Sequence, residues 1–274
     1  MSGPDDKIVS HYGGAELFRK IMETLESSGV AANKIAAEHI KSIDEFHIGG
    51  EDATIALLDQ LGLDKGTRVL DVGAGIGGPA RLMTTRYGAD VTGLDLTPDF
   101  VQTAVELTNF LSLPTQFKVG SALDIPFDDA SFDVATLLHV GMNLPDKDKL
   151  FSEVSRVLKP KGRFAVYDVM RFGKAPAFPL PWASDPTASF LTEPDIYLEA
   201  ADKAGFDLLS RRDRVEIAKE FFANLKARIE DSGPPVLGLP MVMGATAAEK
   251  VANMTTAVGA GDIAPVEMIF KKRD

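Results

Sequence analysis

The amino-acid sequence predicts an α/β fold: a doubly wound, mostly parallel sheet with an N-terminal helical flap and helical lid insertions. Three observations support this prediction. Short β-branched segments alternate with amphipathic helical segments between residues 67 and 170. A glycine-rich turn follows the first of these strands, at residues 73–78. Apolar residues recur at helical spacing before and after this region, at residues 13–43 and 194–257.

Five strands are predicted in the central region. They are expected over residues 68–72, 90–94, 116–119, 132–138 and 163–169. One of the helices between them is expected to begin at Pro98 with Thr97 as its N-cap, because proline suits the first helical position. A later helix is expected to end at Pro160. Its apolar face comprises Leu150, Val154, Val157 and Leu158.

The flanking segments complete the predicted architecture. Residues 13–43 contain two helices separated by Ser28-Gly29. Beyond Met170 we expect a helix over 194–203, a strand from Phe206, helices over 215–229 and 247–257, and a last strand over 266–271. We divide the chain into a flap (1–60), an α/β core (61–172) and a segment that completes the sheet and carries lid insertions (173–274), all within one domain.

Composition limits the function classes. The 274 residues are 45% hydrophobic, enough for one sizeable core, and their net charge of −11 disfavours a nucleic-acid partner. The chain has no cysteine and its histidines lack metal-binding spacings, so we expect no metal. No apolar run approaches the ~18 residues of a membrane span, and no secretory signal is visible. We therefore expect a cytoplasmic protein without a membrane partner.

The glycine-rich turn that follows Asp71 has two interpretations. With Gly73, Gly75 and Gly78 it matches the G-x-G-x-x-G fingerprint of dinucleotide sites, and Asp95 then stands where a ribose-binding carboxylate belongs. The alternative reading is the D-x-G-x-G-x-G pattern associated with S-adenosylmethionine (SAM), formed by Asp71, Gly73, Gly75 and Gly77. Spacing does not separate the two. A pyrophosphate at the helix N-terminus would lie unfavourably close to Asp71, whereas a cofactor with a sulfonium and an ammonium would be attracted to it.

Further motifs follow this turn in order along the chain. They are Gly93-Leu94-Asp95-Leu96, residues 120–127, Ser131-Phe132-Asp133-Val134 and residues 156–163. Together with residues 69–78 they resemble the class I SAM-dependent methyltransferases, over roughly residues 45–210. The resemblance extends more loosely to small-molecule enzymes of that class, namely sarcosine/dimethylglycine N-methyltransferases, sugar O-methyltransferases and ubiquinone C-methyltransferases.

The resemblance implies that SAM is the cofactor and that its site begins at the glycine turn. The methionine portion of SAM would be held by three residues: Gly73, Gly75 and Gly77. Asp71 would help to anchor the amino group of SAM. Residues 46–50 resemble the segment that closes over the cofactor in this family.

The resemblance also implies residues for the adenosine portion. Asp95 would bind the two ribose hydroxyls, and Leu96 would pack on the adenine. Many relatives have an aspartate that accepts a hydrogen bond from the adenine amino group, but this chain has Ser121 at that position. The backbone of Ala122, or the nearby Asp124, is expected to substitute.

Two polar residues end the fourth and fifth predicted strands. Because ligands of open α/β sheets lie beyond the carboxyl ends of the strands, His139 and Asp168 are expected to face the transferring methyl group. Both are candidate catalytic residues, and His139 is also a candidate cofactor contact. Methyl transfer from an activated sulfonium depends mainly on alignment, so a base is needed only where the acceptor arrives protonated.

Three functions remain open. They are a SAM-dependent methyltransferase with a small-molecule acceptor, a catalytically inactive SAM-binding regulator or scaffold, and an NAD-dependent dehydrogenase. Nothing after Asp168 resembles a second mononucleotide-binding half, which argues against the dehydrogenase. The intact glycine turn and strand-end polar residues argue against a scaffold. The methyltransferase is therefore the function that we expect.

The acceptor is expected to be enclosed under a lid made from residues 11–50, 172–192 and 230–245. An amine of the sarcosine or dimethylglycine type is favoured first, and a hydroxyl or an activated carbon otherwise. Ring faces for a cationic amine could come from Phe172, Phe178, Trp182, Phe190 and Tyr197. A carboxylated amine would also need a cationic partner, for which the candidates are Arg171, Lys174 and Arg19. The apolar loop 234–244 is suited either to the lid or to a contact in a homo-oligomer.

Overall fold

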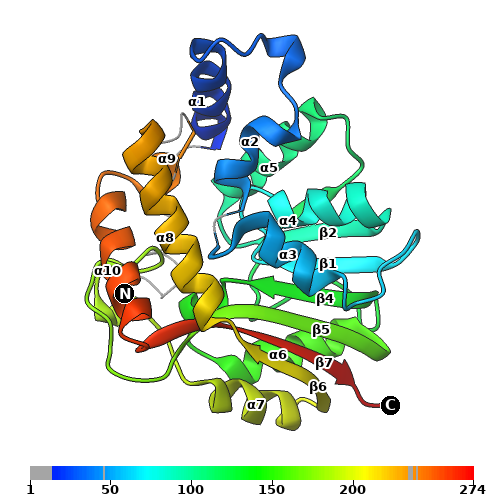
Figure 1. The fold of residues 1–274 in the computed structure, drawn as a ribbon. Helices are drawn as coiled ribbons and strands as arrows, with labels where there is room; N and C mark the ends of the chain where they lie inside the picture. Colours follow the sequence, from blue (N-terminus) through cyan, green and yellow to red (C-terminus); the bar gives the residue numbers. More distant parts are fainter. Residues whose placement is uncertain (1–13, 46, 234–236, 239) are drawn as a thin grey trace, which may run out of the picture.

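Seven strands form one sheet in the order β3-β2-β1-β4-β5-β7-β6, with helices packed against it (Figure 1). The computed structural model describes residues 14–45, 47–233, 237–238 and 240–274. Strands β1 to β5 run parallel to their neighbours among these five, and β7 runs antiparallel to both β5 and β6. The strand bounds are β1 (Arg68–Val72), β2 (Asp90–Asp95), β3 (Gln116–Val119), β4 (Phe132–Leu138), β5 (Leu158–Arg171), β6 (Phe206–Asp213) and β7 (Ile263–Lys272). The predicted doubly wound, mostly parallel α/β fold is confirmed.

The predicted helices are present, with ends that differ by a few residues. Those expected over 194–203, 215–229 and 247–257 correspond to α7, α8 and α10. The helix bounds are α1 (Gly14–Ser27), α2 (Ala37–Asp44), α3 (Gly50–Leu58), α4 (Gly78–Leu82), α5 (Pro98–Phe110), α6 (Lys147–Val157), α7 (Pro194–Lys203), α8 (Val215–Ser232), α9 (Pro240–Met243) and α10 (Ala247–Gly259).

Two apolar cores lie on the two faces of the sheet. Successive residues of β5 alternate between them, as the period of two in a strand requires. Phe164 and Val166 pack in the core that contains residues of α6 and α7. Ala165 and Tyr167 pack in the core that contains residues of α3 and α4. Burial of both faces explains why the central strands are almost continuously apolar.

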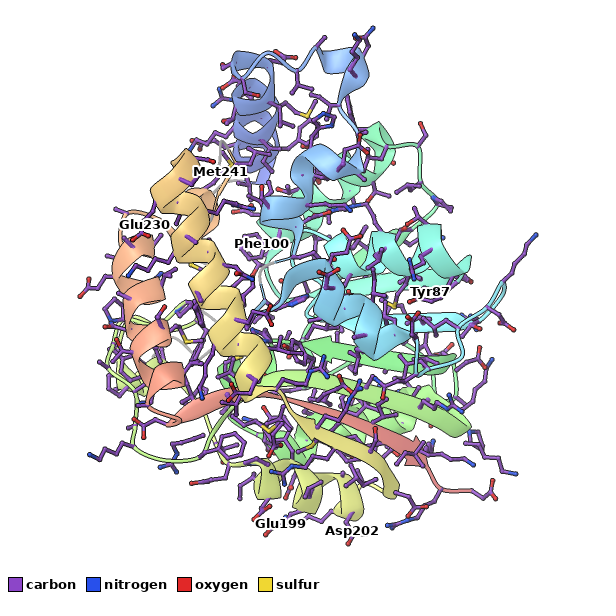
Figure 2. All side chains as sticks on the ribbon, in the orientation of Figure 1. Tyr87, Phe100, Glu199, Asp202, Glu230 and Met241 are labelled. Atoms are coloured by element: carbon purple, nitrogen blue, oxygen red, sulfur yellow. The ribbon has the colours of Figure 1, made fainter. Side chains whose placement is uncertain are left out.

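The flap and the lid have apolar clusters of their own. Leu17 of α1 packs in one cluster with Leu107 of α5. Met241 of α9, which is labelled in Figure 2, packs against this cluster. Phe222 of α8 and Met254 of α10 belong to a second cluster, which also contains Ile263, the first residue of β7. These helices therefore stand over the edge of the sheet where β1 and β4 end.

One predicted boundary is wrong. Leu158 does not continue the apolar face of a helix, because α6 ends at Val157 and Leu158 is the first residue of β5. Leu158 has an extended backbone (φ −77°, ψ 140°) and pairs with Phe132 of β4. Pro160 disfavours the helical conformation for the residue before it, so the chain has already become extended when it reaches the proline.

No helix in the described ranges combines the length and the hydropathy that a membrane span requires. Some predicted features lie outside the described residues: residues 11–13 of the flap, Phe46, and residues 234–236 and 239 of the apolar loop.

Candidate functional site

A cavity of about 1470 Å³ lies at the carboxyl ends of the parallel strands, beneath the flap and the lid. Small-molecule pockets usually measure ~300–1,000 Å³, so this cavity has room for a cofactor together with a second small molecule. Its walls come from the flap between residues 38 and 52, the strand ends of β1, β2 and β4, the segment 181–190, and the inner faces of α8 and α10. This is the edge at which ligands of open α/β sheets bind.

The three glycines of the turn have different surroundings. A Cβ on Gly73 would lie 2.3 Å from Val140 Cγ2, and one on Gly77 would lie 2.5 Å from Phe117 Cζ, so packing excludes a side chain at both positions. A Cβ on Gly75 would meet no atom within 4 Å. Gly73 and Gly75 border the cavity, whereas Gly77 is not among its lining residues. Only Gly75 therefore leaves open space of the kind that a bound cofactor would fill.

Asp71 presents one free carboxylate oxygen at the cavity wall. The residue is 2% exposed, and its Oδ1 accepts a hydrogen bond of 2.7 Å from Thr136 Oγ1. Its Oδ2 is buried and has no hydrogen-bond partner among the described residues. Burial raises the pKa of Asp71 to about 7. Since unpartnered buried acceptors are rare in folded proteins, this oxygen is suited to a cationic ligand group in the cavity.

Asp95 is held by the turn that it faces. Its Oδ2 accepts from the backbone N–H of Gly75 at 2.8 Å, and its Oδ1 accepts from that of Thr97 at 2.9 Å. Burial raises the pKa of Asp95 despite these two hydrogen bonds. Each oxygen keeps acceptor capacity for a further donor, such as a hydroxyl group of a ligand.

The segment after β3 continues the wall on the side of Asp95. Leu96, Ser121 and Ala122 all border the cavity, and Asp124 does not. Ser121 Oγ accepts from the backbone N–H of Leu123 at 3.1 Å, so this hydroxyl also braces its own loop. Direct contact of Asp124 with a ligand in the cavity is therefore not supported.

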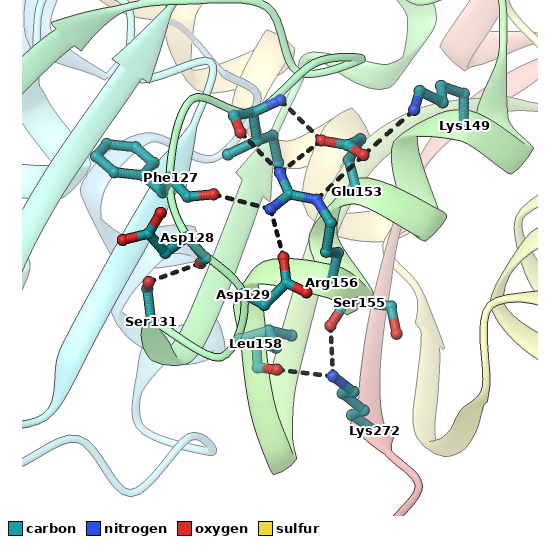
Figure 3. A network of polar contacts seen from close by, with 11 residues as sticks. Phe127, Asp128, Asp129, Ser131, Lys149, Glu153, Ser155, Arg156, Leu158 and Lys272 are labelled. Carbon is teal, nitrogen blue, oxygen red and sulfur yellow. Dashed lines mark hydrogen bonds and ion pairs between the residues drawn. The ribbon is translucent and has the colours of Figure 1, made fainter.

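Arg156 of α6 fixes the continuation of this loop from below (Figure 3). Its guanidinium donates to the backbone carbonyls of Ile125 at 2.7 Å and Phe127 at 2.8 Å, and to Glu153 Oε2 at 2.8 Å. Glu153 Oε2 in turn accepts from the Ile125 N–H at 2.9 Å. The hydrogen bond from Arg156 lowers the pKa of Glu153 to about 2. A charged pair therefore anchors the loop that carries Ser121.

His139 and His47 lie side by side in the wall of the cavity. Their ring centroids are 5.6 Å apart, and both residues border the cavity. His139 Nε2 is buried without a hydrogen-bond partner in the described part of the chain, and burial together with His47 lowers the pKa of His139 well below its ordinary value. His47 Nε2 lies 2.7 Å from Glu45 Oε2 and 2.8 Å from Thr54 Oγ1. His139 is thus a neutral imidazole with a free ring nitrogen.

Asp168, the other candidate catalytic residue, lies elsewhere. It is fully buried, accepts a 2.6 Å hydrogen bond from Tyr197 Oη, and is not among the residues that line the cavity. Its neighbour Tyr167 belongs to the core beside α3, so the alternation along β5 points Asp168 toward α7. The structure therefore brings His139, but not Asp168, to the cavity.

The lid side of the cavity is mainly apolar. Of the five aromatic residues expected there, Trp182 and Phe190 border the cavity and the other three do not. Sequence reasoning did not include the wall from α8 and α10, whose apolar members are Phe221, Phe222, Leu225, Val251 and Met254. The same wall also contains the polar residues Asn224, Arg228 and Lys250. The helical spacing of the apolar residues was a signal, because it gives each helix an apolar stripe.

Residues 70–166 match the family model described as a methyltransferase domain. The chain is 33% identical over 178 residues to Methyltransferase GfsG of Streptomyces halstedii, which covers 63% of this chain and 64% of that protein. It is 42% identical over 106 residues to the 2-methyl-6-phytyl-1,4-hydroquinone methyltransferase of Synechocystis, covering 39% of this chain and 33% of that protein. The chain thus spans less than two thirds of the length of these curated relatives.

The fold also matches solved structures. The Haemonchus contortus phosphoethanolamine N-methyltransferase 2 in complex with S-adenosyl-L-methionine superposes with a TM-score of 0.72 at 22% identity, covering 93% of this chain and 60% of that one. A likeness at this identity concerns the fold. Residues 70–166 therefore match a methyltransferase domain in sequence, within a chain whose fold matches that of a methyltransferase.

Proposed function

We propose that the protein is a SAM-dependent methyltransferase that acts on a small molecule enclosed in the cavity. The observation that carries this proposal is the free Oδ2 of Asp71, buried in the wall beside the open space at Gly75. A carboxylate in this setting suits a cofactor that carries cationic groups, and would repel the pyrophosphate of a dinucleotide. The family of residues 70–166 supports the same cofactor.

The residues present fit SAM along the whole wall. Asp71 would hold its ammonium group, Gly75 would give it room, and Asp95 would accept hydrogen bonds from the ribose hydroxyls. Leu96 and the backbone of Ala122 would border the adenine. When bound there, SAM supplies a methyl group on a positively charged sulfur, which is already activated for displacement.

His139 is the residue that we assign to the reacting end. Its free Nε2 would accept a hydrogen bond from the nucleophilic hydroxyl of the acceptor and so orient an oxygen lone pair toward the methyl group. The oxygen becomes strongly acidic as its new bond to carbon forms. A weakly basic neutral imidazole is then sufficient to take the proton.

The acceptor is proposed to be a molecule with an apolar body and a hydroxyl group. The large apolar residues that border the cavity from the lid side include Trp182, Phe190, Phe221, Phe222, Leu225, Val251 and Met254. The cations considered for a carboxylated amine, Arg19, Arg171 and Lys174, do not border the cavity. Three other cationic residues do border it, and a carboxylated acceptor would have to pair with one of them: Lys41, Arg228 and Lys250.

An amine acceptor is the second candidate. Trp182 and Phe190 border the cavity and present aromatic rings there, and a cation over such a ring is stabilised by ~0.5–2 kcal/mol. An uncharged amine would need no base, so its methylation would not depend on His139.

The test is incubation with SAM that carries a labelled methyl group and separate panels of apolar phenols and hydroquinones, small amines, tRNA and peptides. We expect label in the hydroxyl-bearing panel, and its loss in Asp71→Asn. Label found only in the amines would show that the acceptor is an amine and not a hydroxyl-bearing molecule. Label confined to tRNA or peptide would contradict an enclosed small-molecule site.

A further inference from the structure

We propose that Lys147, Asp168 and Tyr197 form a buried clamp that positions the acceptor-facing wall of the cavity. The three residues are positioning residues: none of them borders the cavity among its lining residues, and they act through the backbone of residues that do. The inference rests on the proposed function, because the wall in question is the one assigned to the acceptor.

Lys147 begins α6 but its side chain turns inward. The residue is 6% exposed, although it stands in the charged sequence Asp146-Lys147-Asp148-Lys149 that is typical of a solvated helix start. Its Nζ donates to the backbone carbonyl of Leu144 at 2.6 Å and to that of Phe190 at 3.1 Å. One ammonium group therefore joins two segments that are 46 residues apart in the chain, and both carbonyls belong to residues that border the cavity.

Tyr197 and Asp168 complete the cluster. Lys147 Nζ lies 5.6 Å from the centroid of the Tyr197 ring, and Tyr197 Oη donates to Asp168 Oδ2 at 2.6 Å. Tyr197 and Asp168 are 1% and 0% exposed. Gly141 is packed directly on this pair, because a Cβ there would lie 2.2 Å from both Asp168 Oδ2 and Tyr197 Oη. The turn at residues 141–143 is thus held from beneath by the same cluster.

The two clamped segments are also joined to each other. The Phe190 N–H donates to the Met142 carbonyl at 2.8 Å, and Met142, Leu144 and Phe190 all border the cavity. Lys147 bonds to Leu144 and Phe190, and Phe190 bonds to Met142. These hydrogen bonds connect the residues of one patch of the wall to each other and to Lys147. A buried lysine and a buried aspartate are costly unless their polar atoms are satisfied, and here each charge is satisfied by groups that shape this patch.

Charge is needed at both ends of the clamp. Burial lowers the pKa of Lys147 to about 8, and the carboxylates that oppose this effect are Asp168 and the N-cap residue Asp146. Burial raises the pKa of Asp168 to about 6, opposed by the hydrogen bond from Tyr197 and by Lys147. Both groups are therefore charged together between about pH 6 and pH 8. We expect the contacts of Lys147 and Asp168 to be strongest in this pH interval and to weaken at lower and at higher pH.

The single tryptophan of the chain reports on the clamp without a substrate. Trp182 borders the cavity, and its Nε1 donates to Ser189 Oγ at 3.0 Å, next to the clamped Phe190. Acrylamide quenching of its fluorescence, measured with the full chain against pH, is the test. Lys147→Met removes both hydrogen bonds, so we expect the quenching constant at pH 7 to rise by about twofold, the sign of a locally opened segment. Lys203→Met, on the exposed surface of α7, is the matched control and should leave the constant unchanged.

Asp168→Asn provides a readout that a merely structural role would not move. Removing the carboxylate lowers the pKa of Lys147 further, so the alkaline rise in quenching should move from about pH 8 to lower pH. A quenching constant in Lys147→Met equal to that of the wild type, with cooperative unfolding, would overturn the proposal. So would an alkaline rise in Asp168→Asn at the pH of the wild type. If Lys147→Met does not fold, Asp168→Asn and Tyr197→Phe decide by the same measurement.

Titration with S-adenosylhomocysteine, the cofactor product, separates this inference from the proposed function. We expect its dissociation constant to be unchanged in Lys147→Met, because the two hydrogen bonds that this variant removes end on Leu144 and Phe190, neither of which is assigned to the cofactor. Weakened binding of this product in the variant would contradict a clamp confined to the acceptor wall. If the wild type does not bind S-adenosylhomocysteine, the proposed cofactor is wrong. The quenching of Trp182 would still show whether the clamp exists.

Discussion

Thr136 Oγ1 donates a 2.7 Å hydrogen bond to Asp71 Oδ1 between residues that the β1–β4 register places side by side. The bond uses one carboxylate oxygen and leaves Oδ2 without a partner within the described residues. Two adjacent parallel strands thereby hold one carboxylate in the cavity wall with one of its oxygens unbonded among these residues. The same arrangement keeps an ionisable group buried at a cost to stability, which is typical of a functional site.

Asp71→Asn should stabilise the fold while it weakens cofactor binding. The folded pKa of about 7 lies above the ordinary 3.8, so the wild type loses stability as pH rises between these values. The asparagine can still accept from Thr136 and carries no charge. We expect urea unfolding at pH 8 to give a free energy higher by about 1–3 kcal/mol than the wild type. Near pH 4 this advantage should disappear, and equal stability at both pH values would contradict the assigned pKa.

Gly75→Asn should block the cofactor without unfolding the protein. Gly75 has φ +55°, a conformation that asparagine tolerates better than other side chains, and its side chain would occupy open space in the cavity. Gly66→Asn is the matched control, because Gly66 also has positive φ (+96°) and open surroundings but does not border the cavity. Calorimetry should show loss of S-adenosylhomocysteine binding only in Gly75→Asn. Equal binding by both variants would place the cofactor elsewhere.

His139→Asn should reduce turnover far more than cofactor affinity. His139 has φ +54°, and asparagine accepts this backbone conformation but cannot take up a proton. For a hydroxyl acceptor, we expect kcat to fall by about 10²–10⁴. The lowered pKa of His139 keeps it neutral at pH 7, so the wild-type rate should not fall between pH 8 and 7 because of this residue. A decrease in kcat of less than about threefold would show that His139 contributes only to packing.

Glu153→Gln should destabilise the protein in a pH-dependent way. The folded pKa of about 2 lies below the ordinary 4.5, so the stability contributed by Glu153 is present above pH 4.5 and is lost as pH falls toward 2. We expect the free energy of unfolding at pH 7, measured with urea, to fall by about 1–3 kcal/mol. The reason is that the Glu153 side chain, which pairs with Arg156, is only 8% exposed. Glu199→Gln on the exposed surface of α7 should change little (Figure 2). A constant loss down to pH 2.5 would show that the carboxylate charge is not involved.

The core of the site could be predicted because its signals are local in sequence. Asp71 precedes the glycine turn and Asp95 ends the next strand, so the parallel order of β1 and β2 brings them together. The different surroundings of the glycines were not predictable in this way. Gly77 lacks a side chain because of Phe117, forty residues later, and no local pattern indicates that contact.

The clamp formed by Lys147, Asp168 and Tyr197 could not be predicted from the sequence. Strand-end position placed Asp168 near the reacting centre, but the face on which it lies depends on the alternation along β5 and on the packing of α7. Lys147 stands in a charged helix start, and only the return of Phe190 to the turn at residues 141–143 buries it. Long-range contacts of this kind fix side-chain orientation after the topology is already decided.

Binding of the cofactor at Asp71 is best tested by a calorimetric titration with S-adenosylhomocysteine at pH 7, repeated in two buffers of different ionisation enthalpy. The ammonium of the ligand favours the ionised form of Asp71, whose pKa is about 7 in the free protein. We expect one site with a micromolar dissociation constant and net release of protons, and no proton release in Asp71→Asn. Absence of binding, or binding with no difference between the two buffers, would contradict a cofactor held at Asp71.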